Sequence, residues 1–223
     1  MFDLKTLPQV ITAIGGLGTA AFGLVDATKA LGGGVNHFGF AAIKKTVMAL
    51  TPGQPTNALS QKKILETLKA NWFNGTDLAS QKAIAKSLIK LNLNPNNAAA
   101  LAAETGVDPA VLTSVATKIA GGTSLSTTPV NESDVYARFD LIVTALLDET
   151  YQRSDNRFRN WTRLVAAIVA VALALVAGAT LNPPIGWELS ALVGLLATPL
   201  APIAKDLSTA LATAVNTLQL VKK

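Results

Sequence analysis

The hydrophobic pattern of this chain is dominated by one run of eighteen residues without a charge, Leu164 to Leu181. A run of this length is typical of a membrane-spanning helix, because a helix in lipid satisfies its own backbone hydrogen bonds. A basic, aromatic segment comes directly before it, with Arg153, Arg157, Arg159, Arg163 and Trp161. Arginines beside a span favour the cytoplasmic side, where they contact anionic lipid headgroups, so this segment predicts the orientation of the helix.

The polar residues before this run continue the same helix. From Glu132 onward, an apolar face recurs at helical spacing, made of Val135, Phe139, Ile142 and Leu146. No Pro or Gly separates this face from Leu164, so we expect one stalk-and-span helix over 132–181, about 75 Å long at 1.5 Å per residue. An apolar face of this size has to be covered, by the chain's own helices or by a partner. We assign it to partner binding.

A second hydrophobic segment lies near the N-terminus, from about Leu7 to Ala27. Its small residues predict close helix packing through Gly15, Thr19 and Gly23, although a single, poorly packed anchor fits equally well. The segment also resembles a signal peptide with a cleavage site near Ala20. Because Asp3 balances Lys5 before it, the charge pattern favours a retained span.

A third apolar segment, about Ile185 to Ala204, follows a turn at Asn182–Trp187. Together with the other two segments it predicts three spans. The tail after it, 205–223, is amphipathic and is typical of a helix on a membrane surface or against a partner helix.

The polar middle of the chain predicts a small helical domain. Apolar residues at helical spacing indicate four helices between residues 58 and 120, and Asp108 with Pro109 is a typical helix start. We therefore expect an all-α integral membrane protein with four parts. These are an N-terminal span with a short interfacial helix (1–50), a cytoplasmic helical domain with its linkers (51–128), a stalk continuing into a transmembrane hairpin (129–204) and the C-terminal amphipathic helix (205–223).

Composition and charge agree with a membrane location. Half of the residues are hydrophobic, only 15% are charged and the mean hydropathy is +0.38, which is too apolar for a typical soluble domain. Lys and Arg gather between the first two segments and after the third, while the turn at 182–187 has none. This distribution predicts an outside N-terminus and an inside C-terminus. With no cysteine, the chain has no disulfide, thiolate metal site or cysteine nucleophile.

One motif resembles a known family. The run Asp148-x-x-Tyr151-x-Arg153, then Phe158-Arg159-x-x-Thr162 leading into a span, is similar to a family of uncharacterised bacterial integral membrane proteins. In that family a motif like Asp-x-x-Met-Asp-Arg enters a hydrophobic helix, and the Pro184–Trp187 turn followed by another span is also similar. The resemblance covers about the last ninety residues and implies a multi-pass protein of the bacterial cytoplasmic membrane. It implies no activity.

Few residues are candidates for chemistry. The single histidine, His37, has no acid nearby in the sequence, and no His, Asp and Glu residues stand at metal-ligand spacing, so we expect no cofactor, metal site or catalytic residue. Asp26 and Glu188 are ionisable residues at the ends of predicted spans, where they are either functional or in contact with interfacial water. Lys82, Lys86 and Lys90 form a basic stripe that could contact anionic lipid or nucleic acid, but is more typical of a solvated helix face.

These observations predict a non-enzymatic membrane scaffold or anchor subunit of a bacterial complex. The alternative is a subunit of a homo-oligomeric channel or pore, in which the glycine-rich first span packs around an axis. A membrane enzyme is the third hypothesis. Expected partners are the lipid bilayer and either another protein or further copies of this chain, without nucleic acid.

Overall fold

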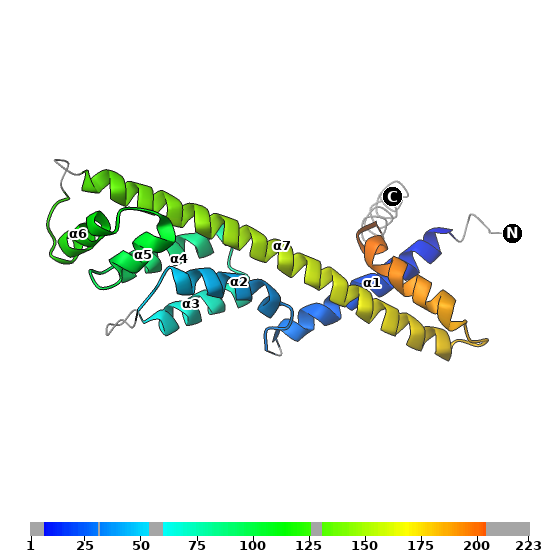
Figure 1. Ribbon diagram of the computed structural model, residues 1–223. Coiled ribbons are helices and arrows are strands. Elements are labelled where there is room, and N and C mark those ends of the chain that lie inside the picture. Colours follow the sequence, from blue (N-terminus) through cyan, green and yellow to red (C-terminus); the bar gives the residue numbers. More distant parts are fainter. Residues whose placement is uncertain (1–6, 31, 54–59, 126–130, 204–223) are drawn as a thin grey trace, which may run out of the picture. The chain divides into compact units, whose positions relative to one another are not determined.

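The computed structural model describes residues 7–30, 32–53, 60–125 and 131–203, and all regular structure in these ranges is helical (Figure 1). The helices are α1 (Leu7–Ala30), α2 (Asn36–Ala49), α3 (Gln61–Phe73), α4 (Leu78–Asn92), α5 (Ala98–Thr105), α6 (Pro109–Ala120), α7 (Glu132–Thr180) and a last helix, Trp187–Ile203. The all-α prediction is confirmed for this part of the chain. The predicted amphipathic helix at 205–223 lies outside the described residues.

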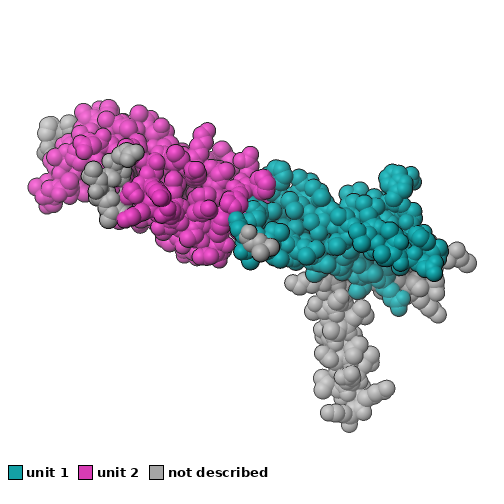
Figure 2. Space-filling view, turned by 90° about the horizontal axis from the view of Figure 1, so that it is seen from below, with its two compact units in different colours: residues 1–35, 159–223 teal, residues 36–158 magenta. Residues whose placement is uncertain are grey.

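The chain divides into two compact units, residues 1–35 with 159–223 (unit 1) and residues 36–158 (unit 2), coloured separately in Figure 2. This division differs from the boundaries predicted after residues 50 and 128. Phe40, Ile43 and Val47 of α2 are buried in the core of unit 2, so α2 is not an interfacial helix attached to the N-terminal span. The first part of α7 belongs to unit 2 for the same reason.

Local signals define the helix ends in unit 2. The side chains of Ser60, Asp77 and Asp108 accept hydrogen bonds from backbone N–H groups three residues later, which satisfies donors that a helix start leaves free. Pro109 occupies the first turn of α6, as predicted. Gly106 ends α5 with a φ of +65°, a left-handed conformation that glycine adopts without strain.

Unit 2 has one hydrophobic core. Its largest fully buried side chains come from six different helices, α2 to α7, and include Ile43, Ile64, Leu68, Ile89, Leu101, Leu112, Phe139, Leu147 and Tyr151. At the end of unit 2 where α7 begins, the two carboxylate oxygens of Glu132 accept hydrogen bonds from Ser114 and Lys118 of α6, both at 2.7 Å. This buried acid is therefore fully partnered, and it fixes the start of α7 against α6.

At the other end of unit 2, Trp72 of α3 joins α2 to α7. Its indole N–H donates a hydrogen bond to the Asn36 carbonyl at 3.0 Å, and its ring lies edge-on to Phe158, with centroids 6.1 Å apart. Gly39 allows this approach, because a Cβ there would collide with the Trp72 ring and come within 3.1 Å of the Ser154 carbonyl. Asn36 and Phe158 are the first and last residues of unit 2, so both of its covalent connections to unit 1 start beside Trp72.

Candidate functional site

Small residues form the interior of unit 1. Its buried cluster consists of Ala21, Ala170 and Ala197, one from each of α1, α7 and the last helix. A methyl group added at Gly18 would collide with the Ala197 carbonyl, and one added at Gly194 would come within 2.5 Å of Val171 Cα. Such close approach of helix backbones is typical of helices that pack in lipid.

The large apolar side chains of unit 1 lie on its outer surface instead. Exposed to about half or more of their full area are Leu24, Leu164, Ile168, Val176, Leu181, Trp187, Leu189, Leu192, Leu195 and Ile203. Unit 2 has the opposite arrangement, because most of its Phe, Leu and Ile side chains lie in or against the core. In water, contiguous apolar surface is uncommon on monomeric proteins and is typical of sites that contact a membrane or a partner.

Two helices in the described residues are long and apolar enough to cross a membrane, one over Gln9–Ala30 and one within Glu132–Thr180. Only 22% of each apolar window is buried by the rest of the chain, whereas the core helix of a soluble protein would be mostly buried. The third predicted span is a helix over Trp187–Ile203. Its 17 residues stand at the lower end of the length that spans the hydrocarbon core.

The predicted packing face of α1 is only partly right. Gly15 is buried, but Thr19 and Gly23 are exposed, and a Cβ at Gly23 would meet nothing within 4 Å. The buried positions are Gly15, Gly18, Ala21 and Val25. The prediction placed the packing face at every fourth residue after Gly15. The buried positions instead lie three residues apart from Gly15 to Gly18 and from Gly18 to Ala21, so the buried face of the helix is turned away from Thr19 and Gly23.

The basic residues before the hydrophobic run of α7 are all exposed. Arg153 forms an ion pair with Glu149 one turn earlier, and Arg157, Arg159 and Arg163 follow along the helix. Trp161 lies among them, 37% exposed. An amphipathic Trp beside arginines, one turn before an uncharged run, suits the boundary between lipid headgroups and hydrocarbon.

The two acids at the predicted span ends are also exposed within the chain. Asp26 pairs with Lys29 on the next turn of α1 at 2.5 Å, and Glu188 lies in the first turn of the last helix. Neither carboxylate points into the small-residue interior of unit 1. A polar pathway through a single copy of unit 1 therefore receives no support from these acids.

The predicted partner face on α7 is covered by the chain itself, so its assignment to partner binding is wrong. Phe139 is fully buried in the core of unit 2, and Val135, Ile142 and Leu146 pack against that core. The most buried face of α7 repeats every four residues, at Phe139, Val143, Leu147 and Tyr151. The apolar stripe predicts a covered surface correctly, but a single sequence does not say what covers it.

The basic stripe on α4 is not a free surface either. Lys86 and Lys90 pair with Asp140 of α7 at 2.6 and 2.8 Å, and Lys82 pairs with Asp148. Burial alone would raise the pKa of Asp140, but the hydrogen bonds from Lys86 and Lys90 outweigh it and lower that pKa. The hydrogen bond to Asp140 in turn raises the pKa of Lys90.

Neither acid was predicted to pair with the lysines of α4, although the sequence contains a signal for it. Asp140 and Asp148 are eight residues apart on α7, and Lys82 and Lys90 are eight residues apart on α4. Equal spacing of opposite charges on two helices is what an antiparallel ladder of ion pairs requires.

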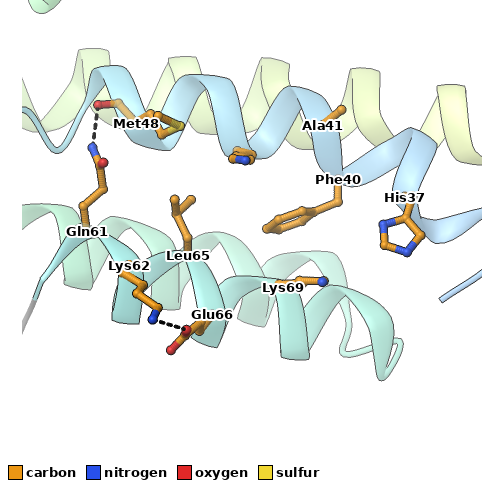
Figure 3. Close-up of a pocket in the computed structure, with 10 residues that line it drawn as sticks. His37, Phe40, Ala41, Met48, Gln61, Lys62, Leu65, Glu66 and Lys69 are labelled. Atoms are coloured by element: carbon orange, nitrogen blue, oxygen red, sulfur yellow. Dashed lines mark hydrogen bonds and ion pairs between the residues drawn. The ribbon is translucent and has the colours of Figure 1, made fainter. Parts of the chain in front are cut away.

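A groove of about 500 Å³ lies between α2 and α3 of unit 2 (Figure 3). Phe40, Met48 and Leu65 form its apolar floor, and Lys44, Lys62 and Lys69 line it from both helices. At one end Gln61 donates hydrogen bonds to the carbonyls of Met48 and Thr51, which ties α3 to the end of α2. His37 lies at the other end, edge-on to Phe73 with ring centroids 4.9 Å apart. Sequence reasoning missed this groove, because its two sides come from segments that a linker separates.

In the described residues, no three His, Asp or Glu side chains gather where they could hold a metal ion. The groove, the ion-pair ladder and the small-residue interior of unit 1 are therefore the features from which a function can be argued. Comparison with protein-family models, with curated proteins and with solved structures finds no match to this chain. The resemblance noted around Asp148–Thr162 stays a prediction.

Proposed function

We propose that this chain is a non-enzymatic membrane anchor, in which unit 1 is embedded in the lipid bilayer and unit 2 is a helical scaffold module at the cytoplasmic surface. One observation carries this proposal: unit 1 has small residues inside and large apolar residues outside. Lipid accommodates such an outer surface without cost, because hydrocarbon is as apolar as the side chains. In water each exposed Leu or Ile would forgo about 1.5–3 kcal/mol of burial.

The orientation follows from the basic residues. The exposed arginines of α7 precede its hydrophobic run, and the turn between α7 and the last helix contains no Lys or Arg. By the positive-inside rule, unit 2 then lies in the cytoplasm, and the turn and the N-terminus lie outside. We propose three spans on this basis, in the bacterial cytoplasmic membrane.

The scaffold role rests on what unit 2 offers to a partner. It has a hydrophobic core of its own, the lysines of its α4 ladder pair with Asp140 and Asp148, and its most exposed large apolar residues are Leu91 and Leu141. Lysines that are paired in this way offer nucleic acid less free charge than an unpaired stripe would. Contacts with a protein partner would therefore use the apolar surface around Leu91 or Leu141, and not the buried stripe of α7.

A homo-oligomeric channel or pore is the second candidate, and the exposed face of α1 favours it. Gly16, Ala20 and Gly23 lie on that face, and a Cβ at either glycine would meet nothing within 4 Å. Small residues at this spacing permit close approach of a second helix in lipid.

Purification of the full chain from membranes in mild detergent separates the two candidates. The scaffold predicts a different protein in fixed ratio, retained by Gly16→Leu/Gly23→Leu and lost in Leu91→Ser/Leu141→Ser. A closed ring of identical copies that conducts ions after reconstitution, and that Gly16→Leu/Gly23→Leu disrupts, would replace the scaffold with the channel. Recovery of the wild-type chain in the soluble fraction after alkaline carbonate extraction would contradict both.

A further inference from the structure

The groove between α2 and α3 combines an apolar floor with a basic rim. Phe40 and Leu65 extend into it from opposite helices, and Met48, which is 42% exposed, adds a third apolar side chain to the floor (Figure 3). Its volume of about 500 Å³ falls within the range of sites for small molecules. Floor and rim together fit a ligand with an apolar part and a charged part.

The charges on the rim favour an anion. Lys44, Lys62 and Lys69 face one acid, Glu66, which is 3.9 Å from Lys62. Lys44 and Lys69 form no ion pair with a described residue, and the Lys69 ammonium lies 5.1 Å from the centre of the Phe73 ring. Two ammonium groups therefore remain for a ligand, in contrast to the lysines of α4, which pair with Asp140 and Asp148.

The position of the groove favours a lipid over a soluble anion. Its His37 and Phe73 end belongs to the same end of unit 2 as Trp72, Asn36 and Phe158. The chain continues from Asn36 and from Phe158 towards α1 and towards the hydrophobic run of α7. One end of the groove therefore lies beside the residues of unit 2 that lead, along the chain, into the helices proposed to span the bilayer.

We propose that this groove binds one anionic phospholipid of the membrane, with its phosphate held by Lys44 and Lys69 and part of an acyl chain on Phe40, Met48 and Leu65. The inference rests on the proposed membrane location. Attraction between each lysine and an anionic headgroup is large enough to change the affinity about fivefold, so the two lysines together change it by about 25-fold where their effects are independent.

The test uses the full chain, purified and stripped of lipid in mild detergent. Phosphatidylglycerol or phosphatidylcholine is added in known amounts, and native mass spectrometry counts the bound lipids. We expect Lys44→Gln/Lys69→Gln to weaken phosphatidylglycerol binding at least tenfold and Lys44→Arg/Lys69→Arg to keep it. The matched control is Lys45→Gln/Lys63→Gln, which removes the same charge from exposed neighbours outside the groove and should stay within about twofold of wild type.

Several outcomes would overturn the proposal. These are equal loss in the control variant, equal affinity for phosphatidylcholine, or displacement of the lipid by inorganic phosphate or by an acidic peptide at matched charge. Displacement by inorganic phosphate would identify a site for a bare anion, and displacement by the acidic peptide would identify a protein-docking groove. Carbonate extraction of the wild-type chain is scored separately, so a failure of the groove and a failure of the membrane location give different results.

Discussion

Asp140 shows how single residues hold α7 in unit 2. Its carboxylate accepts a hydrogen bond from Lys86 and forms an ion pair with Lys90, both on α4, and the Lys90 ammonium also lies 5.2 Å from the centre of the Tyr136 ring. All three charged side chains are less than one-third exposed, so solvent screens these pairs less than ordinary surface pairs. Removal of the Asp140 carboxylate leaves Lys86 and Lys90 partly desolvated and without this partner. The free-energy cost of leaving them so exceeds the net stabilisation that the ion pairs provide.

Changing Asp140 to Asn should therefore destabilise the chain by about 1–2 kcal/mol at neutral pH. Because the folded pKa of Asp140 is lowered from 3.8, its contribution to stability is present above that value and is lost as the pH falls through the lower folded pKa. The difference between wild type and variant should thus disappear in strong acid. Thermal unfolding in mild detergent, followed by circular dichroism across a pH series, measures this difference.

Glu104→Gln is the matched control, because Glu104 is exposed and forms no ion pair with a described residue. A variant of Asp140 that is as stable as this control at neutral pH would show that the ladder contributes nothing.

At the scale of elements, α7 carries two different kinds of packing along one helix. In unit 2 its buried face holds large side chains, Phe139, Leu147 and Tyr151, whereas in unit 1 it holds Ala166, Ala170 and Ala174. The four-residue repeat is the same in both parts. The difference agrees with the proposed location of unit 1 in lipid, because hydrophobic burial stabilises a core in water, whereas helices in lipid associate through close backbone contact.

Truncation of the two faces of α7 in unit 2 should give very different results. Phe139→Ala removes a fully buried ring and should destabilise unit 2 by about 3–5 kcal/mol. Leu141→Ala, two residues away and 69% exposed, should change stability by less than about 0.5 kcal/mol. Hydrogen exchange of α3 and α4 in the full chain reads out both variants. Equal protection in the two would mean that something other than the core covers the Phe139 face.

The two neighbouring glycines of α1 provide a second matched pair. A side chain at Gly18 meets the Ala197 carbonyl and the Ala201 methyl, while one at Gly16 meets nothing within 4 Å. We expect Gly18→Leu to detach α1 from the last helix and Gly16→Leu to leave that packing intact. A cysteine crosslink between α1 and the helix at Trp187–Ile203 measures the contact, and its survival in Gly18→Leu would contradict the packing described.

For the whole molecule, the sequence predicts where the helices lie in the chain better than which helices pack against one another. Asp108 with Pro109 predicts the start of α6, and the uninterrupted stretch from Glu132 predicts the bounds of α7 to within one residue. The placement of α2 in unit 2, the covering of Phe139 and the ladder to Asp140 depend on contacts between segments up to about a hundred residues apart, such as Thr46 with Thr150 at 3.0 Å. The periodicity of one helix predicts which of its faces is buried, but it does not predict which other segment of the chain covers that face.

The central claim is that unit 1 crosses the membrane with unit 2 on the cytoplasmic side. The chain has no cysteine, and Asn182 and Ser87 are both exposed, so one cysteine at either position reports its own side. A membrane-impermeant maleimide applied to intact bacterial cells should label Asn182→Cys at once and Ser87→Cys only after the cells are opened. Labelling of Ser87→Cys in intact cells, or protection of both positions until lysis, would contradict the account.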